Sequence, residues 1–240
     1  MLKGKKDKTY NWIYDIFDTD LVEVYVICMD SRIDKVKRFF HSINCNPTYL
    51  RAISKYEITK EELIDEGFIM QDCELNMGRI CCHYSHIQAL KRFLNSDSEY
   101  VIIFEDDNRP INRKDYVGVY YIFEYILKHI PKDFELLNLS SCWEDCDLVK
   151  EINEHTVLSY RALCRNAYVM SRKGASKVVT HTVPMRKHSG DNMVANIIKN
   201  EPFLKAYSSK ANLFDQNREV LGSELGNNSK IKRCRGRTKV

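Results

Sequence analysis

Short apolar segments alternate with segments of helical period along this chain, and this alternation limits its possible folds more than any other feature. Runs rich in β-branched and aromatic residues, typical of buried strands, occupy residues 21–29, 47–53, 99–104 and 134–140. Apolar residues three or four positions apart, typical of helices, occur in residues 32–43, 80–94 and 115–130. Strands and helices that alternate in this way form βαβ units. We therefore expect an α/β protein with a mostly parallel, Rossmann-like central sheet.

Local signals refine this expectation at two points. Thr59 is followed three residues later by Glu62, which is the pattern of a capping box and predicts the start of a short helix. Residues 166–179 indicate a strand, an interruption at Gly174 and the beginning of another helix. Residues 141–161 follow no clear period.

The length of 240 residues is enough for one domain with a well-buried core. We expect an N-terminal extension over residues 1–20, one domain over residues 21–226 and a basic tail over residues 227–240. The net charge of +4 is concentrated at the two ends, because residues 229–240 contain six basic residues and no acidic one. The body is mildly acidic, which argues against a nucleic-acid-binding core. The tail either touches an acidic surface or is a solvated end.

Targeting signals and cysteine usage bear on the compartment. No apolar run approaches the roughly 20 residues needed to span a bilayer, and the charged N-terminus lacks the apolar core of a secretory signal. The nine cysteines are scattered, which favours reduced thiols and a cytoplasmic protein. Cys142, Cys146 and Cys164 offer an alternative as zinc ligands, but they lack the paired short spacings of a zinc module.

The segment VIIFEDDNRP, residues 101–110, carries the clearest chemical signal. A buried strand ends in three adjacent carboxylates, Glu105, Asp106 and Asp107. Alternate residues of a strand share a face, so Glu105 and Asp107 point in nearly the same direction. Carboxylates at the end of a strand suit a hard divalent cation that also binds substrate phosphates. The alternative is a solvated acidic turn.

Residues 76–110 resemble the core signature of glycosyltransferase family 25, the lipopolysaccharide and procollagen galactosyltransferase group. That signature is a helix beginning Gly-x-Ile-Gly-Cys-x-x-Ser-His, followed by an apolar strand that ends in Glu-Asp-Asp. The residues that match in order are Gly78, Ile80, Cys82, Ser85, His86, Glu105, Asp106 and Asp107. Further segments over residues 21–226 also resemble the family, including YLRAI, NAYVMSRKGASKVV and SGDNMV.

The chain departs from the family pattern at several positions around the expected nucleotide-sugar site. The departures are Cys28, Ser54, Lys55, Arg79 and Cys81. The late acidic pair of the family is Asp191-Asn192 here, which leaves one carboxylate.

The resemblance implies a glycosyltransferase A (GT-A) fold and assigns roles to the acidic residues. Asp107 ligates Mn²⁺ or Mg²⁺, and Glu105 supports the metal or the nucleotide. Asp106 lies on the nucleotide side, although its opposite direction along the strand favours a role in holding the loop. Asp191 is either a general base that deprotonates the acceptor hydroxyl or an N-cap of the helix that follows.

The resemblance also implies contacts to a UDP-sugar from four other residues. Arg32 reaches the diphosphate or else caps the next helix, and Ala52 leaves space for the nucleoside ring. Ser85 and His86 bind the donor or acceptor sugar, or form a polar pair that ties their helix to the neighbouring strand end.

Three further side chains have weaker signals. Cys82 stands four residues before His86, a spacing that a metal can use, but we favour core packing for Cys82. His181 and His188 are further candidates for metal ligands.

The resemblance implies a metal-dependent inverting glycosyltransferase, a hexosyltransferase that transfers galactose or glucose from a UDP-sugar. The acceptor is a glycan or a hydroxylysine of a collagen-like chain. One alternative is a glycosyltransferase-like binding module without turnover. Another is a metal-dependent phosphohydrolase.

Overall fold

The computed structural model describes residues 21–42, 45–110, 124–141, 143–145, 147–199, 203–211 and 213–216. The expected N-terminal extension, the basic tail and the first part of the helix expected over residues 115–130 lie outside these described residues. Residues 124–129 are helical. The proposed domain boundaries therefore stay predictions.

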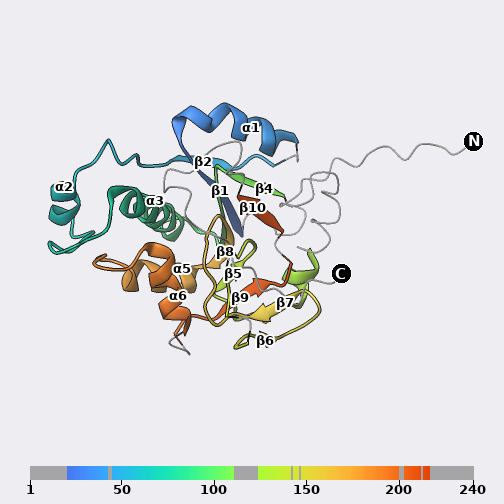
Figure 1. Ribbon diagram of the computed structural model, residues 1–240. Coiled ribbons are helices and arrows are strands. Elements are labelled where there is room, and N and C mark those ends of the chain that lie inside the picture. The colour runs from blue at the N-terminus through green and yellow to red at the C-terminus, as the bar shows by residue number, and fades with distance from the viewer. Residues whose placement is uncertain are drawn as a thin grey trace, which may run out of the picture.

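Ten strands form two sheets in the described part of the chain (Figure 1). The main sheet has eight strands in the order β2-β1-β3-β8-β5-β9-β7-β6. In chain order these are β1 (Val22–Cys28), β2 (Thr48–Arg51), β3 (Tyr100–Glu105), β5 (Leu136–Asn138), β6 (Lys150–Glu151), β7 (Thr156–Leu158), β8 (Ala167–Ser171) and β9 (Ala206–Ser209). The second sheet pairs β4 (Asn108–Pro110) with β10 (Phe214–Gln216) in antiparallel fashion.

The expected α/β class is confirmed, but the sheet is mixed. β2, β1 and β3 are parallel neighbours, as are β5 and β9. β8 runs antiparallel to both β3 and β5, and β7 runs antiparallel to β9 and β6. The reason lies between β5 and β8, where the described chain contains the antiparallel pair β6–β7 in place of a crossover helix. A run of parallel neighbours, as the sequence indicated, occurs only around β1, and β5–β9 is a single further parallel pair.

Helices cover both faces of the sheet. They are the 3₁₀ helix η1 (Asp30–Arg32), α1 (Ile33–Ser42), α2 (Lys60–Asp65), α3 (Met77–Leu94), α5 (Arg172–His181) and α6 (Gly190–Lys199). Alternate residues of β1 enter two different cores. Val24 and Val26 pack in the cluster that includes α1, whereas Tyr25 and Ile27 pack in the cluster that includes α3, α5 and α6. These last three helices lie together on one side of the sheet (Figure 1).

Two helix starts follow from side-chain caps. The predicted capping box is confirmed, because the Thr59 side chain accepts a hydrogen bond from the backbone N–H of Glu62 at 3.2 Å. The Glu62 carboxylate in turn accepts one from the backbone N–H of Thr59 at 2.8 Å. Helix α3 begins at Met77, earlier than expected, because the side chain of Asn76 accepts a hydrogen bond from the N–H of Arg79 at 3.0 Å.

Gly174 does not interrupt the chain, contrary to our expectation. It lies within α5, whose N-cap is Ser171. A β-carbon at this position would lie 2.1 Å from the backbone carbonyl oxygen of Glu135. The glycine therefore allows α5 to approach the chain just before β5, and its role is close packing.

The cysteines are partly as expected. Free thiols are present at Cys28, Cys45, Cys73, Cys81 and Cys82. Cys164 is disulfide-bonded, so the prediction of reduced thiols throughout is wrong at this position. The disulfide also removes Cys164 as a thiolate ligand for the alternative zinc site, whose other two cysteines lie outside the described residues.

Within the described ranges, no helix has both the length and the apolar character required to cross a membrane.

Replacing Gly174 by alanine tests this packing. The added methyl group meets backbone and cannot be relieved by a side-chain rotation, so we expect the free energy of unfolding to fall by about 1–3 kcal/mol or more. Chemical denaturation measures this change. Ser176→Ala, at an exposed position of the same helix, is the control and should stay within about 0.5 kcal/mol of the wild type. A Gly174→Ala variant as stable as the control would contradict the packing role.

Candidate active site

A pocket opens where β1, β2 and β3 end. Each of these strands contributes the residues that follow it, and α3 forms a further wall. The pocket is lined by Ile27, Met29, Arg32, Ala52, Ile53, Ser54, Lys55, Gly78, Cys81, Cys82, Ser85, His86, Glu105, Asp106, Asp107 and Gln216. The residues to which the resemblance assigned roles at the metal and the donor are therefore brought together, whereas His181 and His188 are not among the lining residues. Asp191 is not among the lining residues.

The three adjacent carboxylates differ in their contacts. Asp106 accepts a hydrogen bond from the backbone N–H of Met29 at 2.8 Å and forms an ion pair with Arg32 at 2.8 Å. Both of its oxygens are thus used to fasten η1 to the end of β3. All three carboxylates, Glu105 and Asp107 among them, line the pocket. That Glu105 and Asp107 point in the same direction stays a prediction.

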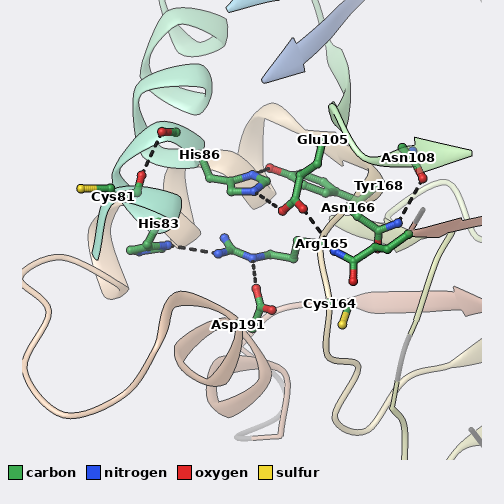
Figure 2. A network of polar contacts seen from close by, with 12 residues as sticks. Cys81, His83, His86, Glu105, Asn108, Cys164, Arg165, Asn166, Tyr168 and Asp191 are labelled. Carbon is green, nitrogen blue, oxygen red and sulfur yellow. Dashed lines mark hydrogen bonds and ion pairs between the residues drawn. The ribbon is translucent and has the colours of Figure 1, made fainter. Parts of the chain in front are cut away.

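Glu105, His86 and Tyr168 form a chain of hydrogen bonds in which His86 and Tyr168 are buried and Glu105 is half-buried (Figure 2). His86 Nε2 lies 3.0 Å from Glu105 Oε1, and His86 Nδ1 lies 3.1 Å from the hydroxyl of Tyr168. Burial lowers the pKa of His86 to about 3, so the imidazole is neutral at neutral pH and has one donor and one acceptor nitrogen. With Glu105 ionised, Nε2–H donates to the carboxylate and the Tyr168 hydroxyl donates to Nδ1.

The same surroundings make Glu105 a weaker acid than an exposed glutamate. Burial raises the pKa of Glu105 to about 7, the charge of Asp191 adds to this effect, and Arg165 opposes it. The Glu105 carboxyl group is therefore able to gain or lose a proton near neutral pH.

Ser85 connects α3 to the segment after β2. Its hydroxyl donates a hydrogen bond to the carbonyl of Cys81 at 2.8 Å and accepts one from the backbone N–H of Ile53 at 3.0 Å. His86 connects the same helix to the end of β3 through Glu105. These contacts match the alternative that Ser85 and His86 are a polar pair that ties the helix to neighbouring strand ends. Both side chains also line the pocket.

Arg165 is a central residue that the sequence did not reveal. It is 4% exposed, and its Nε donates a hydrogen bond to Asp191 Oδ1 at 2.8 Å. Its Nη2 lies 3.2 Å from His83 Nδ1. Figure 2 shows Arg165 between Asp191 and the Glu105–His86 pair. It lies between residues 141–161, which follow no clear period, and the strand predicted from residue 166, so no pattern indicated a buried arginine.

Asp191 lies in the first turn of α6, so its alternative assignment as N-cap is wrong. The residue before it, Gly190, is needed for close packing, because a β-carbon there would lie 2.3 Å from His83 Nδ1 and 2.6 Å from Arg165 Nη2. The helix start thereby approaches the buried arginine, and Asp191 forms an ion pair with it. The Asp191 side chain remains 39% exposed and accessible from solvent.

The three side chains with weaker signals for metal binding have different surroundings. His181 packs its ring against Phe203 with the centroids 4.3 Å apart, and His188 is exposed. Neither belongs to a group of three possible metal ligands among the described residues. Cys82 does not pack in the core as we favoured. It is half-buried and lines the pocket, because the face of α3 that contains Ser85 and His86 also contains Cys82.

The raised pKa of Glu105 predicts a pH-dependent effect of Glu105→Gln in the metal-free protein. Between pH 4.5 and about pH 7 the native state keeps a proton that the unfolded state has released, so this group stabilises the fold less as pH rises. Glutamine does not titrate, so the Glu105→Gln variant does not lose this stability as pH rises. The stability of the variant relative to the wild type should therefore increase across this window, by up to about 3 kcal/mol.

Denaturant titrations at several pH values with a chelator present measure this difference. The lowered pKa of His86 has the opposite effect on stability, but it is present in both proteins. A difference between variant and wild type that does not change with pH would contradict the assignment.

Comparisons with known proteins agree with the resemblance. The family model described as "Glycosyltransferase family 25 (LPS biosynthesis protein)" matches residues 22–196. No curated protein matches the sequence. One similar solved structure, "Crystal Structure of A197 from STIV", has 10% identity and a TM-score of 0.44 over 78% of this chain and 81% of that chain. A TM-score this low gives the likeness no weight for fold or function.

The family match extends from β1 into α6. It includes the three carboxylates, the pocket-lining face of α3 and the Arg165–Asp191 pair. Because it covers well over half of the sequence, the chain belongs to glycosyltransferase family 25.

Proposed function

We propose that this chain is a metal-dependent inverting glycosyltransferase with a GT-A-like nucleotide-sugar site. It transfers a hexose, galactose or glucose, from a UDP-sugar to a glycan or to a hydroxylysine-type acceptor. The observation that carries the proposal is the pocket at the ends of β1, β2 and β3, which combines Arg32 with the carboxylates of Glu105 and Asp107. Pockets at this edge of an α/β sheet commonly bind nucleotides.

The carboxylate oxygens that the pocket offers as ligands fit Mn²⁺ or Mg²⁺. Both ions prefer oxygen ligands, keep several waters and share the phosphates of a substrate. Glu105 and Asp107 line the pocket and are the carboxylates proposed to hold the ion. Asp106 instead fastens Met29 and Arg32 to the end of β3. A divalent ion there supplies charge neutralisation for the diphosphate that leaves the sugar.

The other walls of the pocket suit the remaining parts of the donor. Arg32 is held at the end of β1 by Asp106, where its guanidinium adds positive charge for a diphosphate. Ala52 follows β2 and has a side chain small enough to leave room for a nucleoside ring. Ser85 keeps the backbone of Ile53, next to Ala52, fixed to α3. His86, neutral and hydrogen-bonded to Glu105, orients that carboxylate.

Asp191 is the proposed general base. Its partly exposed carboxylate has one oxygen bound to Arg165 and is close enough to affect the pKa values of Glu105 and His86. An acceptor hydroxyl that approaches from this side loses its proton to Asp191 as its oxygen attacks the sugar carbon. The bond from that carbon to the diphosphate breaks in the same displacement.

One alternative retains support from the structure. Ser54, Lys55 and Cys81, which depart from the family pattern, all line the pocket. A binding module that has lost turnover would show changes in such positions. The phosphohydrolase alternative gains no comparable support.

A screen of nucleotide-sugars with and without Mn²⁺ tests the proposal. We expect Mn²⁺-dependent release of UDP from UDP-galactose or UDP-glucose, and faster release when an acceptor is present. Thermal melts with UDP and Mn²⁺ in the same buffers detect binding separately from turnover. Binding without turnover of any donor would favour the inactive module, and neither binding nor turnover would refute the proposed site.

Asp107→Asn and Asp106→Asn form a matched pair for the metal assignment. Asp107→Asn should abolish Mn²⁺-dependent turnover without lowering stability, because removing one of three crowded carboxylates relieves repulsion. Asp106→Asn instead weakens the contacts with Met29 and Arg32 and should lower the free energy of unfolding by about 1–3 kcal/mol. An active Asp107→Asn enzyme would end its assignment as a metal ligand.

Asp191→Asn tests the general base. A general base contributes about 10²–10⁴-fold to a rate, so transfer to acceptor should slow by that factor while Mn²⁺-dependent donor binding is retained. Loss of the charge beside buried Arg165 should also cost about 1–3 kcal/mol of stability, and rates are therefore compared well below the melting temperature.

Asp72→Asn is the control, because it removes a surface ion pair with Arg186 that lies away from the pocket. It should leave transfer unchanged. Near-normal transfer by Asp191→Asn would mean that another group is the base.

A further inference from the structure

A second set of possible metal ligands lies in the pocket, and its chemistry differs from that of the carboxylates. Cys82 and His86 stand one turn apart on α3, and Glu105 ends β3 beside them. One ligand atom from each of these three side chains lies within 4.8 Å of the other two. All three residues line the pocket, so an ion can enter from solvent.

We propose that Cys82, His86 and Glu105 form a zinc site. The ligands are the Cys82 sulfur, His86 Nε2 and one oxygen of Glu105, with a fourth position open toward the pocket for water or an oxygen of a bound anion. Three protein ligands and one open position are typical of zinc sites that act on a substrate. The thiolate and imidazole favour Zn²⁺ over Mn²⁺ or Mg²⁺, which prefer oxygen ligands alone.

The distances are compatible with tetrahedral coordination after a small adjustment. Zinc bonds of ~2.0–2.3 Å set ligand atoms roughly 3.3–3.7 Å apart. His86 Nε2 and Glu105 Oε1 are 3.0 Å apart, close to this spacing. No pair of ligand atoms is more than 4.8 Å apart, so the Cys82 sulfur lies within about 1.5 Å of the separation that zinc requires.

Neighbouring side chains already orient two of the three ligands. The Tyr168 hydroxyl lies 3.1 Å from His86 Nδ1, so with Nε2 on the metal the Nδ1–H donates to Tyr168 and the ring is held in place. The side-chain amide of Gln216 donates to the second oxygen of Glu105 at 3.4 Å. The first of these contacts is the kind of outer partner that metal-bound histidines have in known sites.

The charges also balance. On binding, the Cys82 thiol releases its proton to solvent, and Glu105 releases one as well if it is protonated. The resulting thiolate and carboxylate together neutralise the two charges of Zn²⁺, while His86 stays neutral. A neutral assembly avoids the cost of an uncompensated ion in a buried setting.

This inference does not depend on the proposed function, because it concerns the binding of zinc alone. It does share Glu105 with the oxygen-ligand site for Mn²⁺. Zinc at Cys82 and His86 therefore draws Glu105 away from Asp107, and the two ions compete for one carboxylate.

Cobalt titration of the metal-free full chain tests the site. Co²⁺ should bind with one-to-one stoichiometry and give a sulfur-to-cobalt charge-transfer band in the near ultraviolet, and Zn²⁺ should displace it. Cys82→Ala should abolish the band. Cys81→Ala, which removes the adjacent thiol, is the matched control and should keep it. Tyr168→Phe leaves all three ligands intact and should weaken zinc binding by about 10–100-fold through loss of the outer contact.

X-ray absorption of the wild-type protein with one equivalent of zinc provides a test that does not depend on any variant folding. The site predicts a single sulfur at ~2.3 Å with nitrogen and oxygen ligands at ~2.0–2.2 Å. A zinc shell without sulfur, or with two or more sulfurs, would overturn the proposal. So would a Cys82→Ala protein that folds and retains the wild-type cobalt spectrum.

Discussion

Three adjacent carboxylates at the end of a buried strand repel one another, and much of the pocket is organised around compensating that repulsion. Asp106 is neutralised by Arg32 and by the backbone N–H of Met29, which binds the end of β3 to the turn after β1. Glu105 is compensated differently, by a hydrogen bond to neutral His86 and by a pKa raised to about 7. The strand can therefore end in three acids because they do not all bear full, unpaired charge in the same place.

A second layer of charge lies beneath the pocket. Arg165 is buried, and it is paired with Asp191 on one side and contacts His83 on the other. Its positive charge offsets the effect of Asp191 on Glu105. The pairing connects α6 to the residues just before β8, so the proposed base and the proposed metal ligands are held in one electrostatic unit. The start of α6 can approach Arg165 this closely because Gly190 has no side chain.

The pocket contains both oxygen-only ligands and a set with sulfur and nitrogen. Glu105 belongs to both sets and is the residue whose protonation state is most sensitive to its surroundings. Under the two proposals above, cation identity, pH and donor binding are linked through this one carboxyl group. Lys55 and Cys81, which differ from the family pattern, line the same pocket. These departures from the family pattern are therefore part of the pocket wall.

Much of the fold and part of the site were predictable from the sequence, because they depend on local patterns. The periods of residues 21–29 and 80–94 identified β1 and α3, and Thr59 with Glu62 identified the start of α2. The meeting of Arg32 with the acidic end of β3 followed from a general rule, since parallel strands gather their carboxyl ends at one edge.

The tertiary structure alone decided the contacts between distant segments. Tyr168 is 82 positions from His86, and Arg165 is 26 positions from Asp191. They meet because β8 enters the sheet antiparallel beside β3, a choice that no local period encodes. The sequence by itself determined the order of the elements and the acidic end of β3, because hydrophobic period and strand alternation are local properties. Burial and the charges of distant residues decide that Asp106 pairs with Arg32 and that Glu105 is able to hold a proton near neutral pH. The packing of distant segments likewise decides that Cys82 faces the pocket. These surroundings exist only in the folded chain.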